Sequence, residues 1–471
     1  MAKFGIGQSV SRFEDPRLLR GKGCFVDDVN QPGQAHAFLL RSPYAHAVIR
    51  SINCGEAASA PGVLGVYTGE DLVRDGLGSM KVNLPRKRPD GSPIFAKSHQ
   101  GLSTGRVRYV GDPVALVVAE TLLQARDAAE LIEIDYEPLP SVTDTAQTVA
   151  PDAPRVWDEC PDNVSNVFQA GDSDKTDAAF ASAAHVVKRR YVISRVYAHY
   201  MQPRGVLASY DEGDERYTIW ADVQYPHRVR NALAESIFKI PEHRIRVIAN
   251  DIGGAFGTKG WQYPEHRLIP WAARKLARPV KWTCERSEAI LADEHARDNV
   301  TDAELALDAE GRILGLRVRT LANVGAYVSS DRNLLATFVN VHTLSGVYAV
   351  AAAHVHVTCV MSNSNATAPY RGAGRPEAIY VIERLLDDSA RELGIDRAEL
   401  RRRNLIAPSA MPYRNPFGAV YDCGEFGRGM ELALEASRYS SFEERRAESR
   451  TKGMLRGIEY ARSHNVPFTG S

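Results

Sequence analysis

Residues 113–140 read PVALVVAETLLQARDAAELIEIDYEPLP, and this stretch predicts a strand, a helix and a second strand in succession. The apolar run 113–119 is typical of a strand that is covered on both faces. Thr121 is a capping residue for the helix, whose apolar stripe is expected to consist of Leu123, Ala125, Ala128, Ala129 and Ile132. Residues 132–137 alternate between apolar and acidic side chains, which predicts a half-buried strand. The stretch therefore favours a fold that mixes helices and strands.

The remaining composition is that of an ordinary globular protein. The chain has 471 residues, enough for about three domains. Its 58 Lys and Arg residues balance 58 Asp and Glu residues, and this zero net charge argues against bulk electrostatic binding of nucleic acid. No run approaches the ~20 apolar residues of a membrane span, and the N-terminus lacks the apolar core of a signal peptide. We therefore expect a cytoplasmic chain with no membrane span.

The cysteines are widely spaced. The chain has 6 of them and none forms a C-x-x-C pair, so we do not expect it to hold an iron–sulfur cluster or a structural zinc ion. They are predicted to be isolated reduced thiols in packed interiors. Any iron–sulfur cluster that serves this protein must then be held by another chain.

Further along the chain, the pattern changes at the polar, proline-bearing stretch 141–163, which predicts a domain boundary. A turn at 308–311 predicts a hairpin. In the strand expected at 354–359, His354 and His356 share a face. They could share a metal, but with no third ligand nearby a solvent-facing strand surface is favoured.

Two helices are predicted near the end. The first begins near Pro376, ends at Gly394 and has an apolar stripe of Ile379, Ile382, Leu386 and Leu393. The second covers 397–404 and is capped by Asp396. Its run of arginines, 401–403, could form an anion site, but a solvated helix face is favoured.

A glycine-rich turn at 250–259, directly after an apolar strand at 245–248, is the first candidate site. Glycines let the backbone approach a ligand closely and point its N–H groups at it. The turn fits neither the dinucleotide fingerprint nor the phosphate-loop pattern. A tight turn with no ligand is an equally good interpretation of the pattern alone. The candidate residues are Gly253, Gly254, Ala255, Phe256 and Gly257.

Two more segments add polar groups. A second glycine-rich loop leads into the helix at Pro376, where an anion would be favourable, although an ion-paired structural loop is the alternative. Its candidate residues are Arg371, Gly372, Ala373, Gly374 and Arg375. Gln224 ends a strand just before a helix expected at 228–238 and can both donate and accept. On its own it would more often be a structural capping residue.

In this order, the three segments resemble the molybdenum-binding large subunit of the xanthine dehydrogenase and aldehyde oxidase family, which also contains aerobic carbon monoxide dehydrogenase. Other segments resemble the same family: 7–21, 41–47, 61–63, 201–204 and 421–426. Gln202 is a departure, because the family usually has Glu there. The resemblance implies an α+β fold in which an α/β hammerhead domain precedes a mixed α/β molybdopterin-binding domain, truncated at the C-terminus.

The implied domain organisation has five parts. These are an N-terminal segment at 1–20, the hammerhead domain at 21–140, a linker at 141–163, the first molybdopterin-binding domain at 164–408 and the start of a second, incomplete one at 409–471. The resemblance to the family weakens after Gly457.

The resemblance also implies the chemistry. The chain would bind molybdopterin, with the cytidine dinucleotide form as one option, and hydroxylate an aldehyde or an N-heterocyclic carbon with oxygen from water. Electrons would pass to a 2Fe–2S small subunit and an FAD-binding medium subunit. Gln224 would hydrogen-bond an oxygen ligand of molybdenum, Phe256 and Gly257 would offer N–H groups beside the metal, and Arg371 would lie close to the metal and the pterin.

Departures from the family narrow the activity. Gly372 and Ala373 follow Arg371, where carbon monoxide dehydrogenase has a bridging cysteine, so carbon monoxide is disfavoured. Gly260 stands where purine oxidisers have a glutamate, so xanthine is disfavoured. No Gly-x-Gly-Glu segment supplies the general base, and Glu425 belongs to an earlier family landmark. Two hypotheses follow: a split enzyme whose second molybdenum domain is a separate chain, or a truncated, non-catalytic fragment or assembly component.

Overall fold

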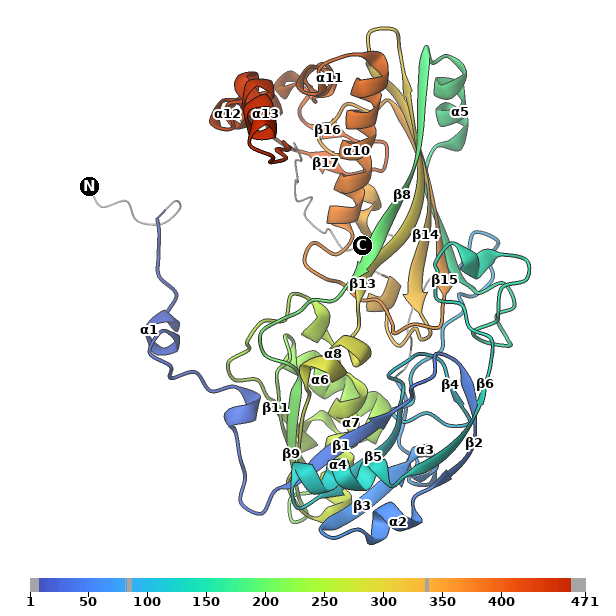
Figure 1. The fold of residues 1–471 in the computed structure, drawn as a ribbon, viewed down its shortest axis with the longest axis vertical. Coiled ribbons are helices and arrows are strands. Elements are labelled where there is room, and N and C mark those ends of the chain that lie inside the picture. Colours follow the sequence, from blue (N-terminus) through green and yellow to red (C-terminus); the bar gives the residue numbers. More distant parts are fainter. Residues whose placement is uncertain (1–7, 81, 83–86, 335–338, 459–471) are drawn as a thin grey trace.

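The computed structural model describes residues 8–80, 82, 87–334 and 339–458. The molecule is elongated, with a seven-stranded sheet in one half and a five-stranded sheet in the other (Figure 1). Both sheets contain parallel and antiparallel pairs, so the predicted mixture of helices and strands is confirmed. The predictions that concern residues 1–7 and 459–471 lie outside the described residues.

The seven-stranded sheet combines two regions that are far apart in the sequence. Its order is β11-β10-β9-β12-β1-β5-β3, and the two regions meet where β1 pairs in parallel with β12. The strands are β1 (Ala35–Arg41), β3 (Val63–Thr68), β5 (Pro113–Ala119), β9 (Gly205–Asp211), β10 (Arg216–Ala221), β11 (Ile245–Ile248) and β12 (Val280–Thr283). The segments predicted as two successive domains therefore share one sheet.

The stretch 113–140 forms the predicted strand, helix and strand. These are β5, α4 (Leu122–Glu130) and β6 (Glu133–Pro138), and β6 pairs with β2 (Ala47–Asn53), which also pairs with β4 (Arg106–Val107). The Thr121 hydroxyl accepts from the Gln124 N–H at 3.3 Å, as its capping role predicts. The inclusion of Leu123 in the buried stripe was wrong, because its side chain is 68% exposed. The small residues Ala125, Ala128 and Ala129 instead let the helix lie close to the sheet.

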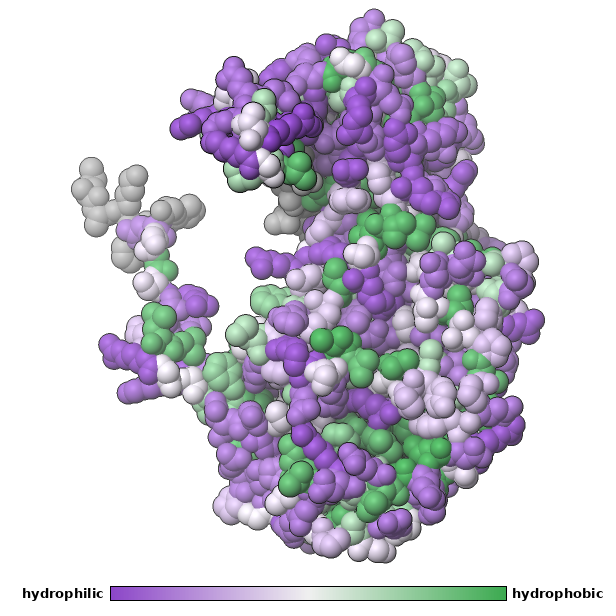
Figure 2. Space-filling view, viewed as in Figure 1, coloured by the Kyte–Doolittle hydropathy of each residue, from purple (hydrophilic) through white to green (hydrophobic). Residues whose placement is uncertain are grey.

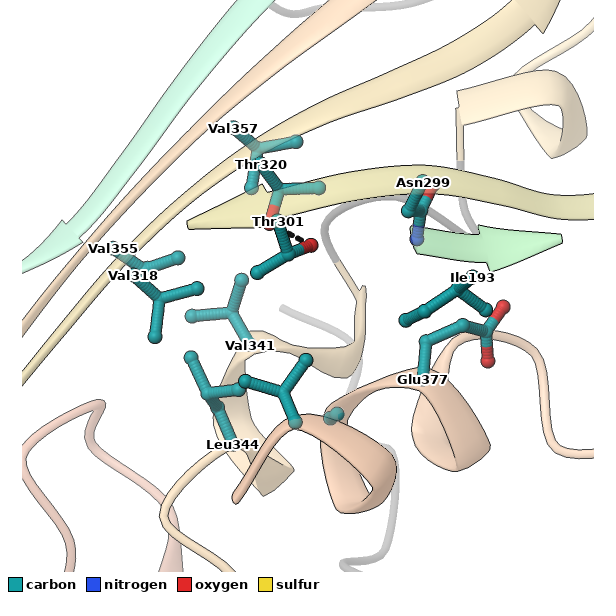
Figure 3. A pocket seen from close by; sticks show the side chains of 12 residues that line it. Ile193, Asn299, Thr301, Val318, Thr320, Val341, Leu344, Val355, Val357 and Glu377 are labelled. Carbon is teal, nitrogen blue, oxygen red and sulfur yellow. Dashed lines mark hydrogen bonds between the residues drawn. The ribbon is translucent and has the colours of Figure 1, made fainter. Parts of the chain in front are cut away.

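The five-stranded sheet, of order β7-β15-β14-β13-β8, is covered on one face by a long helix, α10 (Arg375–Leu393), which packs on β8 and β13. The strands are β7 (Val164–Gly171), β8 (His185–Val196), β13 (Ala296–Leu307), β14 (Ile313–Gly325) and β15 (Ala352–Met361). β13 and β14 form the predicted hairpin. A valine-rich cavity lies between this sheet, α10 and η6 (Val339–Thr343), with a Thr301–Thr320 hydrogen bond in its wall (Figure 3).

The predicted late helices are present. α10 ends at Gly394 in a left-handed conformation, and the Asp396 carboxylate caps α11 (Arg397–Asn404) by accepting from two N–H groups. The predicted solvated arginine face was wrong for Arg401, which is 1% exposed and pairs with Glu383 and Asp387 at 2.7 Å. The reason is that Arg401 faces α10, whose carboxylates bind it.

Shorter helices connect these elements. They are α1 (Asp15–Leu18), α2 (Gly55–Ser59), α3 (Gly69–Arg74), α5 (Ser173–Ala181), α6 (Pro226–Ala232), α7 (Pro264–Leu276), α8 (Arg286–Ala292), α12 (Phe426–Ala436) and α13 (Phe442–Thr451). The helix predicted at 228–238 is α6 continued by a π-helical turn, Leu233–Phe238. β16 (Tyr413–Arg414) and β17 (Val420–Tyr421) form a small hairpin.

The segment 141–163 is packed rather than extended through solvent. Val142, Val156 and Cys160 lie in the core under the five-stranded sheet, and the Trp157 indole donates to the Ala326 carbonyl at 2.8 Å. This segment therefore packs as part of the core of the five-stranded sheet.

All cysteines are free, but their predicted burial is only partly right. Cys160, Cys284 and Cys359 are buried, whereas Cys24 and Cys423 are exposed. Both exposed cysteines lie in loops, outside any packed element. Within the described ranges, no cluster of three or more metal-ligating side chains occurs, so His354 and His356 have no third ligand with which to hold a metal ion there. No helix in those ranges is long and apolar enough to span a bilayer.

Candidate functional site

The three predicted segments meet at the glycine-rich turn. The Gly257 N–H donates to the Gln224 side-chain oxygen at 3.0 Å, and the Arg371 N–H donates to the Phe256 carbonyl at 2.8 Å. Gln224 follows β10, the turn follows β11, and Arg371 precedes α10. Adjacent parallel strands β10 and β11 bring the first two together at one edge of the sheet. The segments that the sequence singled out thus form one continuous hydrogen-bonded unit.

Unusual backbone conformations shape this unit. Phe256 has a φ of 52° and Ala373 one of 47°, a region that residues other than glycine seldom adopt. Gly257 has a φ of 110°, and a Cβ atom there would lie 2.3 Å from the Pro369 carbonyl oxygen. The two loops interlock only because residue 257 has no side chain. Such non-glycine outliers are concentrated at ligand-binding sites.

Two hydrogen-bond donors of this unit have no acceptor among the described residues. Because an N–H can only donate, the Gln224 oxygen must face Gly257, which leaves the Gln224 NH₂ group directed elsewhere. Neither that NH₂ group nor the Phe256 N–H has a hydrogen-bond partner among residues that the structure describes. The Gly257 N–H, predicted to be free, is already bound to Gln224. Phe256 is 43% exposed and Arg371 is also exposed, so both residues are accessible to solvent.

A buried arginine nitrogen strengthens this pattern. The Arg375 Nε atom is inaccessible to solvent and has no partner among the described residues, although its Nη1 lies 3.4 Å from the Gly372 carbonyl oxygen. Gly372, Ala373 and Gly374 all have positive φ, which opens the loop toward a ligand. A set of amide, backbone and guanidinium donors suits an oxygen-rich, anionic group. The residues present therefore fit a phosphate-bearing pterin with oxygen ligands on its metal.

An ion pair that the sequence did not predict lies behind the turn. Lys259 and Asp222 are both buried and paired, and the Lys259 ammonium also donates to the Gln202 carbonyl at 2.7 Å. Burial raises the pKa of Asp222 and lowers that of Lys259. The Gln202 side-chain oxygen in turn accepts from the Gly253 N–H at 2.7 Å. Lys259 is therefore a support for the turn and is not available to bind a ligand.

A second buried network lies deeper. Arg204 contacts Asp293 at 2.6 Å and Glu265 at 2.7 Å, and Arg41 also contacts Glu265 at 2.7 Å. Burial alone would raise the pKa of Glu265, but the two guanidinium groups hold it well below its ordinary value. This network joins the hammerhead segment, through Arg41, to the floor of the site.

Arg332 is the contributor that sequence reasoning missed. Its guanidinium donates to the Gly257 carbonyl and lies 3.6 Å from the Glu294 carboxylate. A Cβ atom on Gly260 would lie 3.2 Å from the Arg332 Nη2, so the arginine packs against the place where purine oxidisers have a glutamate. Burial raises the pKa of Glu294. No glycine pattern or strand end marks residue 332, so the sequence carried no signal for it.

The turn also anchors the described part of the N-terminal segment, residues 8–20, which stands away from the body of the molecule in Figure 2. The Asp251 carboxylate accepts from two Arg17 nitrogens, at 2.5 and 2.6 Å, and from the Cys24 N–H at 2.7 Å. Arg17 and the Cys24 N–H together lower the pKa of Asp251 from 3.8 to about 2. Bidentate pairing of this kind is geometrically specific.

This contact predicts an acid-dependent release of the segment. Because the Asp251 pKa is depressed, the stabilisation is complete above pH 3.8 and is lost as the pH falls through about 2. Carboxyl ¹³C NMR should give an apparent pKa near 2 for Asp251 in the wild type and a clearly higher value in Arg17→Gln, where the Cys24 N–H is the remaining group that lowers the pKa. An unchanged titration in Arg17→Gln would contradict the proposed contact.

Comparisons with known proteins place this geometry in a family. The molybdopterin cofactor-binding domain family matches residues 156–405, and the α/β hammerhead domain of aldehyde oxidase and xanthine dehydrogenase matches residues 20–140. The nicotine 6-hydroxylase large subunit of Paenarthrobacter nicotinovorans is 36% identical over 96% of this chain and 54% of its own length. The carbon monoxide dehydrogenase large chain of Afipia carboxidovorans is 35% identical over 95% of this chain and 55% of its own.

A solved structure agrees with these relatives. Quinoline 2-oxidoreductase from Pseudomonas putida 86 superimposes with a TM-score of 0.87 at 34% identity, over 95% of this chain and 56% of that one. The chain thus spans about half the length of the relatives that it matches. The first family matches more than half of the chain, and the predicted resemblance and fold class are confirmed. The chain therefore belongs to the molybdopterin cofactor-binding family of xanthine dehydrogenase and aldehyde oxidase, with an α/β hammerhead domain ahead of the cofactor-binding domain.

Proposed function

We propose that this chain is the molybdenum-binding part of a hydroxylase that oxidises an aldehyde or an N-heterocyclic compound. The observation that carries the proposal is the convergence of Gln224, Phe256 and Arg371 around one glycine-rich turn, where the Gln224 NH₂ group and the Phe256 N–H have no partner among the described residues. The bound cofactor would supply the redox chemistry, and the chain would hold, orient and desolvate it.

Each donor has a distinct role in this proposal. The Gln224 NH₂ group would donate to an oxygen ligand of the metal, while its oxygen keeps the Gly257 N–H in place. The Phe256 N–H would be a second donor toward the metal centre. Arg371 and Arg375 would bind the anionic end of the pterin, for which we propose the cytidine dinucleotide form. Arg332 holds the Gly257 carbonyl and so fixes the plane of the peptide that follows it.

The proposed domain organisation follows the sequence boundaries: 1–20, 21–140, 141–163, 164–408 and 409–471. Partner subunits would carry the 2Fe–2S clusters and the FAD, and no residue of residues 1–471 is assigned as the general base. The relatives are named as hydroxylase or dehydrogenase subunits, which favours this proposal over a non-catalytic fragment.

Two sequence positions narrow the substrate class. Gly372 and Ala373 follow Arg371 where carbon monoxide dehydrogenase has a bridging cysteine, which disfavours carbon monoxide, and Gly260 replaces the glutamate of purine oxidisers, which disfavours xanthine. Two of the similar proteins are named for nicotine and quinoline, both N-heterocyclic compounds. We propose an N-heterocyclic ring, with an aldehyde as the second candidate.

Metal analysis of the native complex tests the proposal. A complex isolated through a tag on this chain should contain close to one molybdenum atom per chain, together with iron and flavin. It should hydroxylate an N-heterocycle or an aldehyde from a substrate panel. An intact multisubunit complex without molybdenum would refute the proposal and favour an assembly component.

Substitution of Gln224 tests its double role. Gln224→Glu keeps an oxygen for the Gly257 N–H but removes the NH₂ donor, whereas Gln224→Ala removes both. We expect kcat to fall about 10–100-fold in both variants, with molybdenum retained in Gln224→Glu. Activity lost only in Gln224→Ala would mean that the Gly257 contact alone matters. Gln147→Ala, at an exposed glutamine, is the matched control and should retain full activity.

A further inference from the structure

A second polar cavity lies away from the molybdenum site, where three parts of the chain meet. The loop 97–108 forms most of its wall, Trp157 comes from the segment 141–163, and Tyr327 follows β14. None of the residues that carry the proposed molybdenum site lines it. Ligand sites are often found at junctions of this kind, between separately packed parts of a protein.

The wall of this cavity is positively charged. Lys97, Arg106 and Arg108 contribute side chains to it, and no carboxylate is among its described lining residues. Lys97 pairs with Glu159 at 2.9 Å and Arg106 with Asp158 at 3.2 Å, but these two carboxylates are 59% and 72% exposed. Exposed ion pairs contribute little to stability, so both cations can exchange these partners for a ligand.

Arg108 is held in a fixed orientation. Its guanidinium carbon lies 3.4 Å from the centre of the Trp157 ring, and its Nε donates to the Val156 carbonyl at 3.1 Å. Its guanidinium contacts carbonyl oxygens and the aromatic ring, and it forms no ion pair with a carboxylate among the described residues. A stacked guanidinium loses little freedom when it binds an anion, because its planar donors are already oriented.

Ser103 supplies an independent indication of a ligand. The residue is 7% exposed, lines the cavity, and its hydroxyl oxygen is inaccessible to solvent with no hydrogen-bond partner in the described chain. A buried hydroxyl without a hydrogen-bond partner is unfavourable, and a ligand that accepts from it removes this cost. Its neighbour His99 cannot serve as that partner, because its Nδ1 accepts from the Gly101 N–H and its Nε2 donates to Asp112.

We propose that this cavity binds a phosphoryl group, either as inorganic phosphate or as part of a nucleotide. Three cations and one hydroxyl donor suit a tetrahedral dianion, and the fixed guanidinium of Arg108 offers it paired N–H donors. The assignment rests on the cavity alone and is independent of the proposed molybdenum chemistry.

Calorimetric titration of the full chain, in the complex in which it is isolated, tests the assignment in a buffer free of phosphate. Inorganic phosphate and adenosine 5′-monophosphate are the two probes. Saturable binding of phosphate alone would identify the free ion as the ligand, and tighter binding of the nucleotide would identify its phosphoryl group. Saturable binding of neither probe would overturn the proposal.

Two variants locate the site. We expect Ser103→Ala and Arg108→Lys each to weaken binding about tenfold, since each removes a donor to a charged group. Because its hydroxyl is unpaired without ligand, Ser103→Ala should leave the unliganded protein's unfolding midpoint unchanged or higher, which a structural role would not predict. Arg190→Lys, in an exposed ion pair, should bind like the wild type. Wild-type affinity in both cavity variants would place the ligand elsewhere and refute the proposal.

Discussion

Gly257→Ala should abolish cofactor binding. A Cβ atom at this position would lie 2.3 Å from the Pro369 carbonyl oxygen, and the φ of 110° is one that alanine rarely adopts. The glycine-rich turn and the loop that carries Arg371 would have to separate. We expect molybdenum per chain to fall at least about tenfold, and the remaining activity to fall about 100-fold or more, because misplacement by 1 Å is enough for such a loss.

Elemental analysis and steady-state kinetics on the same preparation would measure both effects. Gly427→Ala is a matched control, since nothing lies within 4 Å of a Cβ atom at that position. It should retain molybdenum and activity. If Gly257→Ala kept both within twofold of the wild type, the interlocking of the two loops would not be needed for the site.

The second large effect is expected from Arg204→Met. Arg204 is fully buried between Glu265 and Asp293, and methionine fills a similar volume without charge. Asp293 would keep the Tyr200 hydroxyl and Glu265 would keep Arg41, but one buried cation would be missing. Breaking a buried pair by removing one partner typically costs about 3–5 kcal/mol, and we expect a loss of this size in the free energy of unfolding.

Urea denaturation followed by tryptophan fluorescence would measure this loss. The comparison is Arg190→Met, where the partner Asp302 is 48% exposed and the pair is in contact with water. That variant should lose no more than about 1 kcal/mol. Equal losses in the two variants would show that the buried network contributes no more than a surface pair.

The sequence predicted the elements whose periodicity is local. The alternation in residues 132–137 and the apolar stripe of α10 each arise because one face of a single element is buried. For this reason β6 and α10 were predicted correctly. Leu123 and Arg401 were misplaced because their environment depends on how far a helix rotates against its neighbours. A helix periodicity fixes which residues share a face, but it does not say which polar groups on another helix will meet that face.

The candidate site was likewise only partly predictable from local sequence patterns. Gln224, Phe256 and Arg371 could be singled out because glycines and strand ends mark places where a backbone can approach a ligand. Arg332 and the Lys259–Asp222 pair could not be assigned, because their roles arise from contacts between distant segments. The position of the Gly257 N–H also required coordinates, since only its distance to Gln224 reveals that it is already bound.

The pairing of β1 with β12 sets the order in which the chain can fold during synthesis. Ala35 cannot pair with Val280 until that residue, roughly 245 positions later, has been synthesised. At 5–20 residues per second, this synthesis takes about 12–50 s. In that interval β1 can pair with β5, but its other edge presents unpaired backbone groups to solvent. The β1 edge of the nascent half-sheet therefore remains open to pairing with other chains until β12 has been synthesised.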